Sequence, residues 1–413
     1  MRHITKRVSS VFYILFLATL ISKPVAVISQ DTIPEYGLMF SYQIEEGLAH
    51  GAIRNNSSAA YAYAKIGDYA KALSTYGLKT DLDLGTPLDY LPKDLHAVSA
   101  VDYIAAQAEY HEIIIISEAH QKPRHRVFTK SLLQKLYNQG YRHLGLEALP
   151  TFNVHPMFPL DSLVSSSGYP LVSDKIRGYT TEPNMVNLIR TAIDIGYDVF
   201  GYEKDGMKHD EMERDSAQAS NIIDHMTTHP TGKYLIHCGW YHAIENDQLK
   251  RRSSRYMAYN LKKLTGKDPL TVYQDLLDEE LSVEESPHYK NLSASESSIF
   301  FDKEGKPFMF YEDFDFFDLL VYHPRTSYRN QRPDWIYADN SKEFFVSGLN
   351  KDYLPAIIRA IPIDNKLDAA PIDIIEVKYV RDRKPLVLLP GKYKLLIKYD
   401  RGPDEIRIIE VEP

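Results

Sequence analysis

The chain has 413 residues, a formal net charge of -8 at pH 7 and 44% hydrophobic residues. At about 150 residues per domain, this length predicts two or three structural units with a sizeable apolar core. The acidic balance, with no run of lysine or arginine, argues against nucleic-acid binding, and the single cysteine, Cys238, excludes an intrachain disulfide framework and a CxxC zinc or redox site.

Residues 1–29 have the pattern of a secretory signal peptide. A basic start precedes an apolar stretch over residues 11–21 that is too short to span a bilayer, and Val27 and Ser29 form a small-residue cleavage site. We therefore expect an exported protein, periplasmic or secreted. An uncleaved N-terminal anchor is the alternative.

Residues 30–94 are predicted to be helical. Small and aromatic side chains recur at helical spacing over residues 59–73, around a turn at Gly67 and Asp68, in a pattern that resembles one tetratricopeptide hairpin. Because a solenoid needs about three stacked repeats, we expect a helical cap packed on the next domain rather than a peptide-binding array.

Residues 95–335 alternate between strand and helix patterns. Strands separated by helices of this length imply right-handed crossovers and a parallel sheet. The expected strands cover residues 113–116, 143–146, 198–202 and 233–238, with another at 316–322, and the expected helices cover residues 124–140, 184–195, 211–226 and 243–264.

Residues 336–413 carry short strand patterns and turn signals, and we expect a small β-rich accessory domain. The predicted fold class is therefore α/β: a parallel-sheet core with flanking helices, preceded by a helical hairpin and followed by a small β-rich domain. The expected strands of this last domain cover residues 344–346, 356–358, 372–377, 386–389, 393–398 and 406–411.

Polar side chains follow the first four predicted core strands. Glu118 and His120 follow the first strand, Glu147 the second, Glu203 the third and His242 the fourth. Ligands bind outside the carboxyl ends of the strands in an open parallel sheet, because the loops converge there. The sequence therefore predicts a functional site built from these residues.

Other interpretations of these residues stay open. Glu118 and Glu203 could be solvated carboxylates, whereas Glu147 ends an apolar strand and needs a partner to offset its desolvation. His237 lies inside the fourth strand, and alternation along the strand turns it to a different environment from His242, which we favour as the functional histidine.

These residues carry a resemblance. Residues 116–120, 140–147 and 239–242, together with the arginine-containing segment 214–222, resemble the superfamily of erythromycin esterases, ChaN-like haem-uptake proteins and Tiki/TraB metalloproteases. The similarity covers residues of about 115–245 and implies a small α/β core with histidines and glutamates at the strand ends. Ser117 replaces the usual glycine of the first motif, which should restrict a turn there.

The spacing within the first motif also differs from one branch of the superfamily. Glu118 and His120 stand two residues apart, as in the ChaN-like pattern, rather than three apart as in erythromycin esterases. The resemblance therefore supports the fold more firmly than a macrolide substrate, since such a fold carries several chemistries.

The favoured function is hydrolysis of an ester or amide bond in a small molecule or peptide. His120 would act as general base on a water, and His242 would stabilise or protonate the developing oxyanion or leaving group. Glu118 and Glu147 would orient the histidines or hold a metal. Zn, Mn, Co or Fe would suit the ligand set Glu118, His120, Glu147, Glu203 and His242.

Arginines near the motifs are candidates for substrate binding. Arg124, Arg126 and Arg214 could pair with a substrate carboxylate or with Glu147, since a guanidinium binds carboxylates with two parallel hydrogen bonds. A structural ion pair is the alternative for each.

Two other functions compete with hydrolysis. One is a haem- or iron-binding uptake protein without hydrolytic activity, in which histidine or tyrosine ligates the iron. The other is a scaffold that binds a protein partner through the N-terminal hairpin or the C-terminal β domain. The chain lacks the GxSxG, GxxxxGK[ST] and strand-linked GxGxxG motifs, so serine-hydrolase, P-loop and dinucleotide-binding functions are unsupported.

Overall fold

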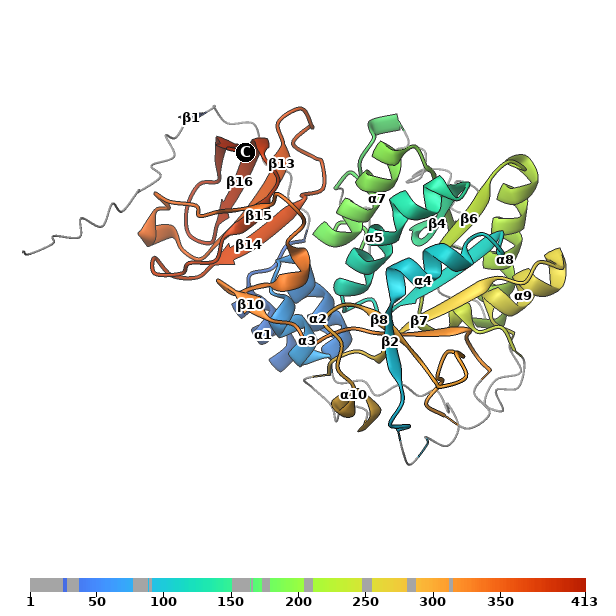
Figure 1. Cartoon of the computed structure of the whole chain (residues 1–413). Helices are drawn as coiled ribbons and strands as arrows, with labels where there is room; N and C mark the ends of the chain where they lie inside the picture. Colours follow the sequence, from blue (N-terminus) through green and yellow to red (C-terminus); the bar gives the residue numbers. More distant parts are fainter. Residues whose placement is uncertain are drawn as a thin grey trace, which may run out of the picture.

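The computed structural model places an α/β core beside a group of N-terminal helices and a C-terminal β-rich region (Figure 1). The predicted signal peptide lies outside the described residues except for β1 (Val25–Val27), which pairs with the last strand of the chain. The described residues are 25–27, 37–76, 88, 91–150, 164, 166–172, 179–203, 211–246, 255–280, 287–311 and 315–413.

An eight-stranded sheet forms the core, in the order β2-β8-β9-β7-β3-β6-β4-β5. The strands from β9 to β5 in this order run parallel, and β2 and β8 form an antiparallel edge. This arrangement confirms the predicted α/β class. The strands are β2 (His96–Ser99), β3 (Ile113–Glu118), β4 (Tyr141–Pro150), β5 (Asp198–Glu203), β6 (Lys233–Gly239), β7 (Leu270–Leu277), β8 (Ser298–Phe301) and β9 (Leu319–Tyr322).

Helices cover both faces of this sheet, which explains why β3 is apolar along most of its length. Ile114 and Ile116 pack with α4 (Ala100–Gln107), α5 (Arg124–Asn138) and α7 (Pro183–Ile195). Ile113 and Ile115 face the other way and share a buried cluster with α8 (Glu211–Thr228) and α9 (Met257–Thr265). The α10 helix (Pro287–Asn291) lies outside these two layers (Figure 1).

Two sequence predictions for the core were wrong in detail. Of the stretch 243–264, which was expected to be mostly helical, residues 244–246 are not helical and helix α9 begins only at Met257. Ile244 adopts a β conformation after a short 3-10 turn. Ser117 does not lie in a turn, since it is inside β3 and pairs with Cys238 of β6.

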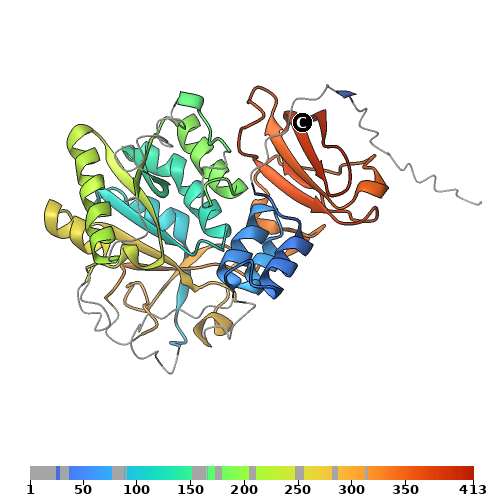
Figure 2. The ribbon, with the colours of Figure 1, turned by 180° about the vertical axis from the view of Figure 1, so that it is seen from behind.

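The N-terminal helices are α1 (Ser41–Ala49), α2 (Asn56–Lys65) and α3 (Tyr69–Thr75). Gly67 has a φ of +71° between α2 and α3, and a Cβ there would lie 2.1 Å from the carbonyl oxygen of Ile374 in the C-terminal region. Glycine therefore permits both the turn and the close packing. From behind, the helices lie against both other regions (Figure 2).

The C-terminal region is an antiparallel sheet in the order β1-β17-β16-β13-β14, beside the pair β12-β15. Most of its strands overlap the predicted ones, and the other short elements connect it to the core. Its elements are β10 (Tyr328–Arg329), β11 (Arg332–Pro333), η2 (Asp334–Ile336), β12 (Lys342–Phe344), η3 (Lys351–Tyr353), β13 (Ala356–Pro362), β14 (Asp373–Val377), β15 (Leu386–Leu388), β16 (Gly391–Tyr399) and β17 (Glu405–Val411). Within the described part of the chain, no helix is long and apolar enough to cross a bilayer.

Candidate active site

The structure brings the predicted strand-end residues together at one edge of the sheet. Glu118 and Glu203 are the last residues of β3 and β5, and His242 lies in the 3-10 turn η1 (Trp240–Ala243) directly after β6. Glu147 lies inside β4, one residue beyond the last residue that β4 pairs with β6. Its carboxylate occupies the middle of the site.

His120 is held on three sides. Its Nδ1 lies 2.7 Å from Oε1 of Glu118, and its ring packs between Tyr179 and Trp240, with centroid distances of 4.3 Å and 4.4 Å. An ionised carboxylate only accepts hydrogen bonds, so Nδ1 carries the proton and Nε2 presents a lone pair when the ring is neutral. That Nε2 lies 3.9 Å from Oε1 of Glu147.

His242 has the same arrangement from the other side. Its Nδ1 lies 2.6 Å from Oδ1 of Asp215 in α8, and Asp215 also accepts a hydrogen bond from the backbone N–H of Met257 at 2.8 Å. Its Nε2 lies 3.8 Å from Oε1 of Glu147. Two imidazoles, each fixed at Nδ1 by its own carboxylate, thus present Nε2 to the same oxygen.

Arg214 connects these groups from α8. Its guanidinium donates to both carboxylate oxygens of Glu203 and to Oε1 of Glu147 at 2.6 Å, and its Nη1 lies 3.0 Å from Nε2 of His242. The Arg214 side chain is 38% exposed, whereas those of His242 and Glu147 are 15% and 6% exposed. Arg214 is therefore the group of this cluster that an incoming ligand reaches most easily.

Arg126 is a buried residue next to His120 that pairs with two carboxylates. It is fully buried and donates to Glu118 through Nε at 2.7 Å and Nη2 at 3.1 Å, and to Glu182 through Nη1 at 2.8 Å. Burial opposes ionisation of Glu118, but the charges of Arg126 and His237 and the hydrogen bonds from His120 and His237 hold the pKa of Glu118 well below its usual value. Glu118 is therefore a permanent negative charge behind His120.

The charges around Glu147 and His242 lower the pKa of the carboxyl group and raise that of the imidazole. Burial would raise the pKa of Glu147, but His242, His120 and Arg214 lower this pKa to about 2. Burial would lower the pKa of His242, whereas Glu147 and Asp215 raise it above its ordinary value. Glu147 therefore stays ionised near neutral pH, and His242 binds a proton more tightly than a free imidazole does.

The two other predicted substrate arginines have structural partners. Arg126 has no exposed side-chain surface, and Arg124 pairs with Asp278 at 2.9 Å while burying most of its side chain. Both guanidinium groups are neutralised by carboxylates inside the fold. Their geometry supports a positioning role, whereas Arg214 is partly exposed, and substrate binding stays a prediction for all three arginines.

The metal prediction for Glu118, His120, Glu147, Glu203 and His242 also stays a prediction. The guanidinium of Arg214 lies among Glu147, Glu203 and His242, so it already supplies the positive charge that a cation would bring there. In the described residues, a group whose possible ligand atoms all lie within 4.8 Å of one another occurs elsewhere, at the opposite end of the sheet.

Sequence reasoning missed several residues that complete the site. Asp215 is adjacent to Arg214 and could have been found as the next residue on the same helix. His237, which was set aside in favour of His242, lies 3.0 Å from Oε2 of Glu118. No local signal pointed to Glu182, Tyr179 or the ring of Tyr61, whose centroid lies 6.3 Å from that of His120.

No protein-family model and no curated protein matches the chain. The solved structure of the type III effector HopBA1 is 13% identical and covers 57% of this chain and 99% of its own, with a TM-score of 0.35. The effector domain RRSP of a MARTX toxin from Vibrio vulnificus is 17% identical and covers 43% of this chain and 36% of its own, with a TM-score of 0.32. ChaN of Campylobacter jejuni, a structure with cofacial haem, is 11% identical and covers 56% and 98%, with a TM-score of 0.31. The chain is thus only distantly similar to ChaN and to toxin effector folds, and the resemblance to erythromycin esterases stays a prediction.

Proposed function

We propose that the protein is an exported hydrolase of ester or amide bonds that uses His120 and His242 as its proton-transferring groups. The observation that carries this proposal is the pair of imidazoles whose Nδ1 atoms lie 2.7 Å and 2.6 Å from carboxylates and whose Nε2 atoms face one centre. A carboxylate at Nδ1 fixes the tautomer and orients the ring, which is what a general base or acid requires.

His120 is the base in this proposal. Its Nε2 takes a proton from a water molecule while the water oxygen attacks the substrate carbonyl. The pair of electrons of the carbonyl π bond moves to the oxygen, and the N–H groups of Arg214 stabilise the resulting negative charge. Because Tyr179 and Trp240 hold the His120 ring, little reorganisation is needed before the step.

His242 is the acid. In its protonated form both ring nitrogens carry hydrogen, Nδ1–H donates to Asp215, and Nε2–H faces Glu147. As the carbonyl re-forms from the tetrahedral intermediate, the C–O or C–N bond to the leaving group breaks and the leaving group takes the Nε2 proton. In its neutral form Nε2 accepts from Arg214, which lies 3.0 Å away. Because a guanidinium only donates, this contact is that of the ring without a proton on Nε2, and His242 takes up a proton there before it serves as the acid.

Haem binding fits this geometry less well. An axial ligand must direct Nε2 to an iron at the centre of a flat macrocycle. Nε2 of His120 instead lies 3.9 Å from the Glu147 carboxylate, in a polar cluster next to Gly239. The observed orientation of His120 therefore suits proton transfer better than ligation of a haem iron.

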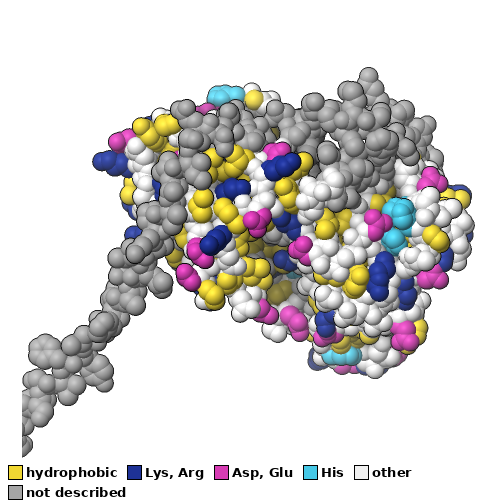
Figure 3. Space-filling view, turned by 90° about the horizontal axis from the view of Figure 1, so that it is seen from above, with side chains coloured by type: hydrophobic (Ala, Val, Ile, Leu, Met, Phe, Trp, Pro, Cys, Tyr) yellow, Lys and Arg dark blue, Asp and Glu magenta, His cyan; other side chains and the backbone are white. Residues whose placement is uncertain are grey.

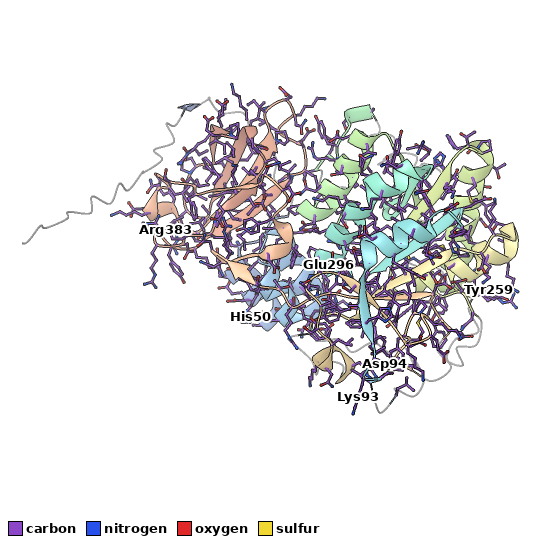
Figure 4. The ribbon with its side chains drawn as sticks, in the orientation of Figure 1. His50, Lys93, Asp94, Tyr259, Glu296 and Arg383 are labelled. Carbon is purple, nitrogen blue, oxygen red and sulfur yellow. The ribbon has the colours of Figure 1, made fainter. Side chains whose placement is uncertain are left out.

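A panel of chromogenic esters and peptide amides tests the proposal on the purified mature protein. We expect turnover that falls by about 100-fold or more in His120→Ala, since a general base contributes about that much. Glu147→Ala should have a similar effect, because it removes the carboxylate that both Nε2 atoms and Arg214 face. His50→Ala is the matched control, because His50 is exposed at the end of α1 (Figure 4).

Two outcomes would contradict the proposal. Turnover that is equal in wild type, His120→Ala and Glu147→Ala would place the activity elsewhere. No turnover on any substrate, together with saturable haem binding that His120→Ala removes, would make the protein a haem carrier.

A further inference from the structure

A second cluster of chemically active side chains lies at the opposite end of the sheet. His143 is near the start of β4, Asp198 is the first residue of β5, and His225 lies in the last turn of α8. Oδ2 of Asp198 is 3.0 Å from Nδ1 of His143 and 2.9 Å from Nε2 of His225, and the two nitrogens are 3.4 Å apart. Figure 3 views the molecule from this side and shows histidine and acidic side chains next to one another on the surface.

The backbone fixes which nitrogen of His143 faces the cluster with a lone pair. Nε2 of His143 lies 2.8 Å from the carbonyl oxygen of Thr231, and a carbonyl only accepts, so Nε2 carries the hydrogen. In the neutral ring, Nδ1 then points a lone pair at the Asp198 carboxylate, which has only lone pairs to offer. Either a second proton on Nδ1 or a metal cation between the two atoms removes this repulsion. A second ring nitrogen that donates to a backbone carbonyl is also what histidine ligands of metals show.

Aromatic contacts hold both imidazoles in place. The ring of His143 stacks on Tyr234 at a centroid distance of 4.4 Å, and the ring of His225 lies between Phe200 at 3.7 Å and His229 at 4.2 Å. The interplanar angle between His225 and Phe200 is 3°. The ligand atoms therefore converge without a rearrangement of the fold, which lowers the entropy lost when an ion binds.

We propose that His143, Asp198 and His225 form a zinc site. Two imidazole nitrogens and one carboxylate oxygen suit Zn²⁺, and bonds of about 2.0 to 2.2 Å to a tetrahedral ion place its ligands about 3.3 Å apart. The three observed separations of 2.9, 3.0 and 3.4 Å are close to that value. The Asp198 side chain is 43% exposed, so solvent can reach the site and a water can take the fourth position.

The site has a structural consequence that is independent of the catalytic edge. Zinc at this point connects the beginnings of β4 and β5 to the end of α8, the helix that carries Arg214 and Asp215 near its other end. The ion would therefore stabilise the fold and hold α8 against the sheet, without taking part in the proposed hydrolysis.

Zinc titration calorimetry on the full mature chain, freed of metal with EDTA, tests the proposal. We expect one saturable equivalent of Zn²⁺, a higher melting temperature with zinc, and visible absorption bands of tetrahedral Co²⁺ when cobalt replaces zinc. Asp198→Asn and His225→Gln keep the size of the side chains and should each weaken this equivalent by at least about tenfold.

Two further variants assign the bound ion to this cluster. His50→Ala removes an exposed histidine, and His242→Gln changes the strand-end site, so both should keep the equivalent. Circular dichroism spectra that match wild type show that the variants fold. The proposal is overturned if wild type binds no zinc, if Asp198→Asn and His225→Gln bind it as wild type does, or if His242→Gln alone removes it.

Discussion

Gly239 and His120 lie so close together that no side chain fits between them: a Cβ on Gly239 would lie 2.5 Å from Cε1 and 2.7 Å from Nε2 of the imidazole. The ring of His120 cannot easily yield, because Tyr179 and Trp240 pack against it. The glycine that ends β6 therefore sets the position of the proposed general base.

Gly239→Ala should reduce turnover by about 100-fold, since a misplacement of about 1 Å has that effect on a catalytic group. Unfolding by denaturant in a double-mutant cycle with His120→Ala isolates the cause. The alanine should lower the free energy of unfolding more in wild type than in His120→Ala, where the clash is absent. Equal losses in both backgrounds would show that the two residues do not interact.

Asp215→Asn should change the pH dependence of turnover more than the fold. Asp215 raises the pKa of His242, so removing its charge lowers that pKa, by about one unit or more for a contacting carboxylate. The acid must be protonated to act, and the alkaline limb of the kcat profile should therefore move to lower pH. Asp224→Asn, an exposed carboxylate on the same helix, is the control and should leave the profile in place. An unshifted limb in Asp215→Asn would exclude His242 as the acid.

The contribution of Glu245 to stability should depend on pH in the opposite sense to that of an ion-paired carboxylate. Burial and the neighbouring charge of Asp318 raise its pKa to about 8, although Thr271 and Lys262 donate hydrogen bonds to it. A carboxyl group whose pKa is raised in the folded protein contributes stability that is fully present below pH 4.5, its ordinary pKa. This contribution is lost as the pH rises through about 8.

The melting temperature of wild type should therefore fall between pH 5 and pH 9 relative to that of Glu245→Gln, which has no proton to lose. Glu109→Gln, at an exposed carboxylate, should follow wild type across the same range. If the difference between Glu245→Gln and wild type is constant with pH, Glu245 does not titrate in this range.

Arg126→Ala should destabilise the protein strongly. The substitution leaves Glu118 and Glu182 buried without their shared cation, and breaking a buried ion pair costs about 3 to 5 kcal/mol. Urea unfolding measures this difference, with Arg54→Ala as the exposed control. A loss no larger than that of the control would mean that solvent or another cation reaches Glu118.

The sequence predicted the cluster of strand-end residues because two of the strands that position it are largely apolar. Residues 113–116 and 234–238 are buried, so the polar residues that follow them mark the strand ends. The strand β7 was missed because Gln274 and Asp275 interrupt its apolar pattern, and Gln274 is polar for a reason the sequence does not contain: its amide donates to the backbone carbonyl of Ser117.

The partners of the site residues were harder to predict than the residues themselves. Asp215 and Glu182 lie on or before helices, where a carboxylate has the same pattern whether it is solvated or holds a buried cation. Arg124 and Arg126 are two residues apart on α5, yet one pairs with Asp278 and the other with Glu118 and Glu182. Only the packing of α5 against the sheet determines which carboxylates each arginine pairs with.

The hydrogen bonds around Glu182 limit how freely the parts of this protein can be exchanged. Glu182 accepts hydrogen bonds from Arg126 and from the hydroxyl of Tyr69 in α3, and the ring of Tyr61 in α2 lies near that of His120. An α/β core that begins at residue 95 would lack both tyrosines. The N-terminal helices therefore form part of the site. A chimera that joins this α/β core to other N-terminal helices would have to supply a matching hydroxyl group and aromatic ring.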